Sequence, residues 1–194
     1  MKQSARMIAS AIALFLSLLF VSFSAFATPM LDLAIVVDSS GGGGTDFWPK
    51  SQAFLNDLVQ NHLPEANTRI SIISFYNTAD TVHRFSDSQN RDDISATIDS
   101  MIWYGGFTNT SSGVQAAIDL FDAESASDTE KAILLLTHNK PTRPIDNPSP
   151  CGLIPDIFQR SITTLVAGVG DRYLTLGGEA ELNCLVQSSD HMTH

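Results

Sequence analysis

Basic side chains are scarce in this 194-residue sequence, which has 11 lysines and arginines against 21 aspartates and glutamates and a formal net charge of −10. Proteins that bind nucleic acids or anionic membrane surfaces use clustered lysine and arginine, because these side chains neutralise phosphate groups. We therefore expect no nucleic-acid partner and no binding to an anionic membrane. The balance of charges is typical of a soluble acidic protein.

Apolar runs long enough to cross a membrane are missing after the first 27 residues. The first six residues include two basic ones, Lys2 and Arg6. An almost wholly apolar stretch follows over residues 7–26, and Ala25-Phe26-Ala27 ends the segment. This order is typical of a secretory signal peptide, so we expect residues 1–27 to be removed and residues 28–194 to form one domain. The alternative is a retained membrane anchor, since about 20 apolar residues can span a bilayer. Cleavage predicts a secreted, extracellular protein, or a periplasmic one in a bacterium.

Cysteine is limited to two residues, Cys151 and Cys184, which both follow the predicted cleavage site. An oxidising compartment favours a disulfide between them. In the chain-entropy model, closing a loop of this length stabilises a fold by about 3–4 kcal/mol. Two buried free thiols are the alternative.

Motifs for nucleotide binding and for nucleophilic catalysis are also missing. Four glycines occupy residues 41–44, but neither a P-loop lysine nor the spacing Gly-x-Gly-x-x-Gly follows them. No Gly-x-Ser-x-Gly sequence is present, which leaves a serine hydrolase only as a remote alternative. We therefore expect that the protein is not an enzyme.

Strand and helix patterns alternate along the rest of the chain. Runs of β-branched and other apolar residues predict strands over residues 31–37, 69–76, 81–85, 131–137 and 161–168. Helical spacing of apolar residues predicts helices over residues 47–63, 92–103, 111–121, 154–159 and 179–186. Near-continuous hydrophobicity is typical of strands covered on both faces. The sequence thus predicts an α/β fold: a doubly wound, mostly parallel sheet with one antiparallel edge strand and helices on both faces.

Polar residues follow two of the predicted strands. Asp38-Ser39-Ser40 comes after the first strand, and Thr137-His138 comes at the end of the strand over residues 131–137. In doubly wound sheets, ligands bind at the carboxyl ends of strands, where the strand order reverses. The sequence therefore predicts a binding site at this end of the sheet.

Three segments resemble the von Willebrand factor type A domain family. Leu33 to Gly41 resembles the first strand and its loop, Gly105 to Thr110 resembles the glycine-threonine loop, and Ala132 to Thr137 resembles the strand before the third metal loop. The likeness runs from about Leu31 to the end of the chain. It implies the doubly wound fold, a protein-binding function and the metal-ion-dependent adhesion site that many members carry.

The resemblance places that metal site on five positions. Asp38, Ser40 and Thr108 match the family's ligands, whereas its second serine falls on Gly42 and its third-loop aspartate falls on His138. A hard divalent cation needs several oxygen ligands, and these two replacements remove a hydroxyl and a negative charge. We therefore expect no cofactor, or a weakly bound divalent cation, Mg²⁺ or Mn²⁺. Zinc is a further alternative, because imidazole suits it better than magnesium.

Several of these residues also have a simpler interpretation. Thr108 could cap the helix that begins near residue 111, and His138 could be a solvated loop histidine. His62 and His83 have no partner pattern, so we expect both at the surface. Asn109 begins a glycosylation sequon, which we expect to be unused if its loop is packed.

The resemblance and the composition together predict an extracellular protein-binding module of adhesion or matrix type. Its partner would contact the face formed by Asp38, Thr108 and His138, with Trp103 and Tyr104 as candidate contact residues. The alternative is a structural or assembly unit, a spacer that has lost the metal chemistry and binds no ligand.

The end of the chain resembles the family only in part. Asn183 to His191 is similar to the helix and turn that precede the family's final strand and closing helix, so the resemblance implies that these two elements are missing at the C-terminus. Residues 162–167 would then form an open sheet edge that could pair with another copy. The alternative is that the natural chain ends at His194 and its last helix covers this edge.

Overall fold

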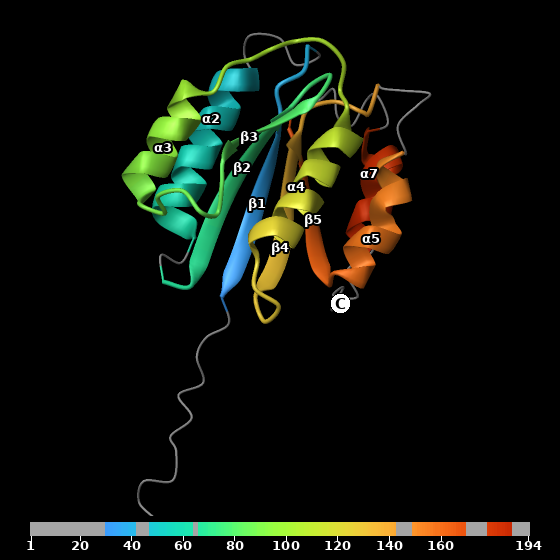
Figure 1. Cartoon of the computed structure of the whole chain (residues 1–194). Coiled ribbons are helices and arrows are strands. Elements are labelled where there is room, and N and C mark those ends of the chain that lie inside the picture. Colours follow the sequence, from blue (N-terminus) through green and yellow to red (C-terminus); the bar gives the residue numbers. More distant parts are fainter. Residues whose placement is uncertain (1–29, 42–46, 64–65, 143–148, 170–177, 188–194) are drawn as a thin grey trace, which may run out of the picture.

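The computed structural model describes residues 30–41, 47–63, 66–142, 149–169 and 178–187, so the predicted signal peptide lies outside the described residues. Its strands form one sheet in the order β3-β2-β1-β4-β5. The strands are β1 (Leu31–Asp38), β2 (Thr68–Phe75), β3 (Ala79–His83), β4 (Glu130–Thr137) and β5 (Ile162–Gly168). All pair in parallel except β3, which runs antiparallel to β2 at one edge (Figure 1). The predicted sheet is therefore confirmed.

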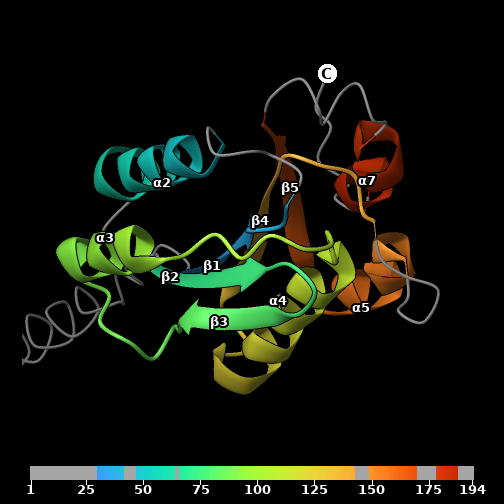
Figure 2. The same ribbon diagram turned by 90° about the horizontal axis from the view of Figure 1, so that it is seen from above.

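Helices lie on both faces of this sheet, as Figure 2 shows from above. They are α2 (Phe47–Asp57), α3 (Arg91–Ser100), α4 (Thr110–Glu124), α5 (Ile154–Gln159) and α7 (Gly178–Gln187). A π-helical turn extends α2 to His62, and a 3₁₀ turn over Pro150–Leu153 leads into α5. Within the part of the chain that is described, no helix is both long and apolar enough to cross a membrane.

The core is divided between the two faces of the sheet. On one face, α2 and α3 pack on alternate residues of β1 and β2, including Ile35 and Ile72. On the other face, α4, α5 and α7 pack on the intervening residues, including Val36 and Phe75. Gly113 lets α4 approach closely, because a Cβ at this position would lie 2.8 Å from side-chain atoms of both Phe75 and Val36. This two-sided burial explains the near-continuous apolar runs of the parallel strands.

The helix predicted over residues 92–103 ends earlier, at Ser100, because α2 supplies a cap for its carboxyl end. The side-chain Nε2 of Gln52 donates a hydrogen bond to the carbonyl of Ile98 at 2.8 Å. Met101 then adopts an extended conformation, with ψ at 141°. Helix carbonyls that find a side-chain donor need no further turn of helix. Residues 101–109 consequently form a loop across the carboxyl end of the sheet.

The expectation that His83 lies at the surface is wrong. The residue ends β3, an edge strand, but its side chain is buried, and its Nδ1 lies 3.5 Å from the hydroxyl of Thr97 on α3. His62 is exposed, as predicted. The difference arises because α3 packs over the end of β3, a tertiary contact that a lone histidine in a sequence does not reveal.

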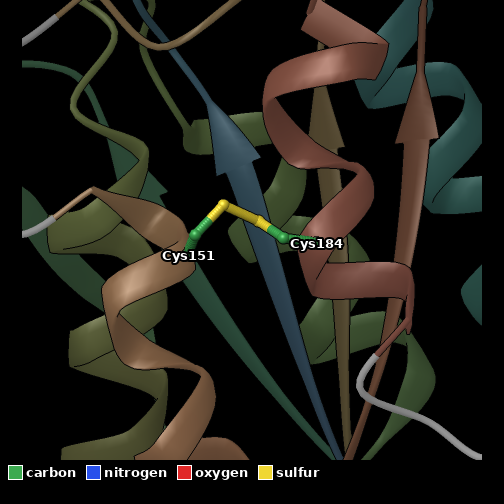
Figure 3. The surroundings of a disulfide bond; sticks show 2 residues. All are labelled: Cys151 and Cys184. Carbon is green, nitrogen blue, oxygen red and sulfur yellow. A yellow bond between two sulfur atoms is a disulfide. The ribbon is translucent and has the colours of Figure 1, made fainter.

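Cys151 and Cys184 form a disulfide with their Cα atoms 5.7 Å apart (Figure 3). Cys151 belongs to the 3₁₀ turn before α5, and Cys184 belongs to α7. The bond therefore attaches α7 to the turn that precedes α5, on the face of the sheet covered by α4.

Candidate functional site

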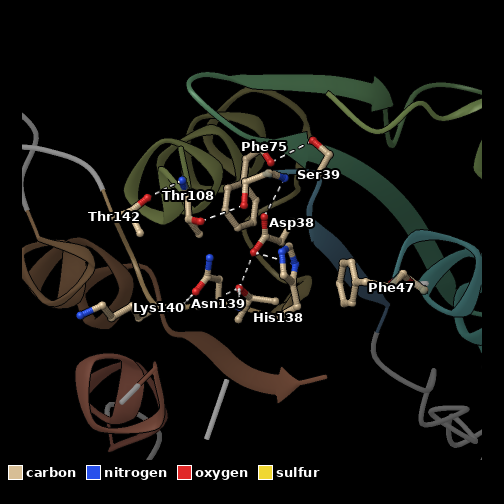
Figure 4. Close-up of polar contacts among 12 residues, drawn as sticks. Asp38, Ser39, Phe47, Phe75, Thr108, His138, Asn139, Lys140 and Thr142 are labelled. Carbon is tan, nitrogen blue, oxygen red and sulfur yellow. Dashed lines mark hydrogen bonds and ion pairs between the residues drawn. The ribbon is translucent and has the colours of Figure 1, made fainter. Parts of the chain in front are cut away.

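A buried carboxylate marks the carboxyl end of β1. Asp38 is the last residue of this strand and is fully buried. Its Oδ1 accepts a hydrogen bond from the backbone N–H of Ser40 at 2.9 Å, and its Oδ2 accepts one from the hydroxyl of Thr137 at 2.7 Å (Figure 4). Thr137 is the last residue of β4, the parallel neighbour of β1. Two adjacent strand ends thus supply donors to the same carboxylate.

His138 lies beside this carboxylate, with its Nδ1 3.2 Å from Asp38 Oδ2. The centroid of the imidazole lies 4.0 Å from that of Phe47, the first residue of α2. His138 is therefore buried, and the interpretation as a solvated loop histidine is wrong. At this distance the imidazole forms an ion pair with the carboxylate when the ring is protonated.

The two hydroxyls that the family resemblance assigned to the site contact each other. The Oγ of Ser40 and the Oγ1 of Thr108 are joined by a hydrogen bond of 2.8 Å, and both side chains are buried. Thr142, on the loop after β4, holds Thr108 in place: its hydroxyl accepts from the Thr108 N–H at 2.8 Å, and its own N–H donates to the Thr108 carbonyl at 3.0 Å. Three loops therefore meet at this end of the sheet.

The N-cap of α4 is Asn109 rather than Thr108, so the simpler interpretation of Thr108 is wrong. The Asn109 side chain accepts a hydrogen bond from the N–H of Ser112. Its Nδ2 donates to the carbonyl of Asn77 at 2.8 Å, and the residue is buried. N-glycosylation modifies this same nitrogen, so the packing of Asn109 supports the expectation that the sequon is unused.

The loop between α3 and α4 is fastened to the loop after β1. The indole N–H of Trp103 donates to the carbonyl of Ser40 at 2.7 Å, and the N–H groups of Tyr104 and Gly105 both donate to the carbonyl of Ser39. Gly106 is needed here, because its φ is +82° and a Cβ would lie 2.8 Å from the Oδ1 of Asn77. The aromatic residues of this loop therefore belong to the same face as Asp38 and Thr108.

The structure brings together Asp38, Ser40, Thr108 and His138, four of the five positions expected from the sequence; Gly42 lies outside the described residues. The described residues contain no group of three or more histidine, cysteine, aspartate or glutamate side chains that could hold a metal ion. Sequence reasoning placed Thr137 at a strand end but missed its bond to Asp38. It missed Thr142 entirely, because a single threonine in a loop carries no pattern.

A mostly parallel sheet with helices on both faces defines a doubly wound α/β domain, and the polar residues at the carboxyl ends of two adjacent central strands lie where such domains generally bind their ligands. The family model for the von Willebrand factor type A domain matches residues 32–192, and the chain therefore belongs to this family. Domains of the family are generally protein-interaction or adhesion modules and are typically not enzymes.

Solved structures with low sequence identity share this fold. One is proximal thread matrix protein 1 from the mussel byssus, in its second crystal form, with a TM-score of 0.69, 19% identity, and coverage of 81% of this chain and 41% of that chain. The same mussel protein with a zinc-occupied MIDAS motif gives a TM-score of 0.63 at 21% identity, covering 77% of this chain and 39% of that one.

An aerotolerance-related membrane protein from Bacteroides fragilis, carrying multiple mutations to serines, gives a TM-score of 0.57 at 17% identity, with 72% of this chain and 68% of that chain covered. The present chain spans about two fifths of the length of the mussel protein, which it covers to 41%. Similarity at this level of identity establishes only the shared fold. The activities of those proteins are therefore not assigned to this chain.

Proposed function

We propose that this protein is a secreted protein-binding module of adhesion or matrix type that engages its partner without a metal ion. One observation carries the proposal: the carboxylate of Asp38 accepts two hydrogen bonds within the protein, from the N–H of Ser40 and the hydroxyl of Thr137, and the Nδ1 of His138 lies 3.2 Å from its Oδ2. A buried carboxylate whose two oxygens are both hydrogen-bonded does not depend on a metal ion to compensate its burial.

The described side chains form a poor ligand set for Mg²⁺ or Mn²⁺. Magnesium requires a nearly octahedral shell of oxygen ligands. Here it would meet one carboxylate, that of Asp38, and would have to separate the hydroxyls of Ser40 and Thr108, which are 2.8 Å apart. It would also meet the imidazole of His138, where the family pattern has an aspartate. Weak or absent binding follows from this loss of charge and of oxygen ligands.

Of these three cations, zinc suits these residues best, since it accepts imidazole as well as carboxylate oxygen. The mussel matrix protein has been solved with zinc in its MIDAS motif. In the present protein a zinc ion bound by Asp38 Oδ2 would compete with the hydroxyl of Thr137, which donates to that oxygen at 2.7 Å, and with the Nδ1 of His138, which lies 3.2 Å from it. Zinc binding is accordingly expected to be weak.

Affinity capture with and without a chelator tests the function. The immobilised protein is exposed to extracellular material from its source in two arms, one with EDTA and one with Mg²⁺ and Mn²⁺. Bound proteins are then identified by mass spectrometry. We expect the same partner in both arms, in similar amount. A partner that is captured only with metal contradicts metal-independent binding, and the absence of any specific partner contradicts the binding function.

Secretion is the second part of the proposal, and it is supported by the basic, apolar and small-x-small order of residues 1–27. Expression of the full chain should release into the medium, or into the periplasm of a bacterium, a protein whose N-terminal sequence begins at Thr28. A product that stays in the membrane with residues 1–27 attached would support the anchor instead.

A second candidate function is assembly through the edge of the sheet, and one observation favours it. Among the described strands, β5 pairs only with β4, contains no charged residue, and leaves Leu165 54% exposed. The opposite edge strand, β3, is short, carries Asp80 and has a register shift where it pairs with β2. Shortness, charge and irregularity protect sheet edges from pairing, and β5 has neither the charge nor the irregularity.

Antiparallel pairing of two β5 strands about Leu165 would bury this side chain in both copies. Light scattering across a range of concentrations tests the idea, with Leu165→Lys as the disrupting variant and Val82→Lys as the control on β3, where Val82 is 37% exposed. We expect a dimer that Leu165→Lys abolishes and Val82→Lys retains. A monomer at high concentration with an ordinary cooperative melt rules out assembly through β5.

A further inference from the structure

The geometry points to a basic segment as the part of the partner that this module binds. We infer that lysine or arginine side chains of the partner rest on an aromatic ridge formed by Trp103, Tyr104 and Phe107. The inference depends on the proposed protein-binding function and specifies the chemistry of the partner.

The three ridge residues expose large apolar surfaces close together on one loop. Trp103 is 38% exposed, Tyr104 is 45% exposed and Phe107 is 51% exposed, and Ile102 beside them is also exposed. Single exposed apolar residues such as Phe54 and Phe158 occur elsewhere on the surface, but these three aromatic side chains lie within five consecutive residues of one loop. Tryptophan and tyrosine are the residue types most enriched among those that dominate the energy of protein interfaces.

The ridge is held in place before any partner arrives. The indole of Trp103 donates to the carbonyl of Ser40 at 2.7 Å, which fixes the ring against the loop after β1. The ring of Tyr104 stacks on that of Tyr76, with centroids 4.5 Å apart and an interplanar angle of 13°. Rings that are already ordered lose little conformational entropy on binding, so their contacts contribute more fully to affinity.

The charge around the ridge favours a cation over an anion. Aromatic ring faces attract cations through the ring quadrupole. Between Arg91 and Lys131, a stretch that contains the whole ridge, the sequence has acidic residues but no lysine, arginine or histidine. Asp99, in the last turn of α3, and Asp80, just after the turn that follows Tyr76, are both exposed.

Basic residues on neighbouring elements do not reverse this balance. Lys140 follows the site on the β4 side and is half-buried, and Lys50 is exposed in the first turn of α2. The whole chain carries a formal net charge of −10. Complementary charge speeds association and excludes partners of the same sign, so an acidic partner would be disfavoured at this surface.

Synthetic peptides of equal length provide the test. A lysine-rich, an arginine-rich and a glutamate-rich peptide, each fluorescently labelled, are titrated with the purified protein at physiological salt, and binding is followed by anisotropy. The diagnostic variant is Tyr104→Leu, which keeps an apolar side chain but removes the aromatic ring. The matched control is Phe158→Leu, an equivalent change on α5 at a residue that is 70% exposed.

We expect both basic peptides to bind and the glutamate-rich peptide not to bind. Tyr104→Leu should weaken the binding of the basic peptides by about 3- to 10-fold, the range of a cation–π contact, while Phe158→Leu leaves it unchanged. Circular dichroism should give the same folded spectrum for both variants.

Two outcomes would overturn the inference. One is the absence of binding by either basic peptide. The other is binding that Tyr104→Leu leaves unchanged, because that would be a general attraction to an acidic protein. Neither outcome affects the proposed function, which is tested separately by affinity capture with and without a chelator. A captured partner whose binding is insensitive to Tyr104→Leu would contradict the basic segment alone.

Discussion

Replacing His138 with aspartate restores the residue type that the family pattern has at this position, and its consequence can be worked out from the contacts of Asp38. The imidazole Nδ1 now lies 3.2 Å from Asp38 Oδ2, and Thr137 donates to the same oxygen. In His138→Asp, a second carboxylate would face the first inside the protein. Two like charges at about 4 Å repel each other by about 4 kcal/mol at an effective dielectric constant near 20.

The expected result is a large loss of stability when no metal is present. A loss of about 4 kcal/mol corresponds to a fall in Tm of roughly 8–16 °C for a domain of this size. Thermal unfolding in EDTA, followed by circular dichroism, measures it. His138→Asn is the matched control, because it removes the imidazole and its contact with Phe47 without adding a charge. We expect this control to lose clearly less stability.

Added metal should partly restore the stability of His138→Asp, since two carboxylates and two hydroxyls approach the ligand set that Mg²⁺ requires. A metal concentration 100 times the dissociation constant would stabilise the variant by about 2.7 kcal/mol. The double variant Gly42→Ser/His138→Asp, which also restores the missing hydroxyl, should bind Mg²⁺ more tightly still by calorimetry. If His138→Asp is as stable as His138→Asn in EDTA, residue 138 does not face Asp38. If the double variant binds no better than the unaltered protein, the metal site has been assigned to the wrong loops.

Three further predictions concern stability. Replacing Cys151 and Cys184 with serine should lower the free energy of unfolding in denaturant by about 3–4 kcal/mol, and peptide mapping without reduction should detect the linked pair; two freely alkylated thiols in protein from an oxidising compartment would contradict it. Gly106→Ala should lower the free energy of unfolding by about 1–3 kcal/mol, and by more than Gly105→Ala does. Both residues have a positive φ, but only at residue 106 would the new Cβ meet another residue, at 2.8 Å. Equal losses of stability in thermal melts would be inconsistent with this packing. The hydrogen bond from Arg160 lowers the pKa of Asp122, so its stabilising contribution is present above about pH 4 and is lost as the pH falls through the folded pKa. Because this carboxylate is largely exposed, Asp122→Asn should cost less than about 1 kcal/mol at pH 7 and nothing at pH 2, as measured by urea unfolding at both pH values.

The fold could be predicted from the sequence because its signals are local and repeated. Each parallel strand is buried on both faces, so a run such as Leu33 to Val37 is almost wholly apolar, and strand type and order follow from such runs. The end of α3 could not be predicted in this way. Its apolar spacing continues through Ile102, but a side chain of α2, Gln52, caps the helix at Ile98, and that contact joins residues far apart in sequence.

The candidate site could be predicted only in its location. Asp38 and His138 follow strands, and parallel strands bring their carboxyl ends together, so their proximity follows from topology. The burial of His138 could not be predicted, because it depends on how the first turn of α2 places Phe47 over the imidazole. The bond between the hydroxyls of Ser40 and Thr108 also depends on tertiary geometry, since it joins two loops.

Titration of the purified protein with Mg²⁺ and with Mn²⁺ in an isothermal calorimeter tests the central claim most directly. The claim is that hydrogen bonds from Ser40 and Thr137 satisfy Asp38, with His138 beside it, so that the binding face functions without a metal ion. It predicts heats of dilution only, with no saturable binding at micromolar metal for either cation. A saturable isotherm with a low-micromolar dissociation constant for Mg²⁺ would contradict it.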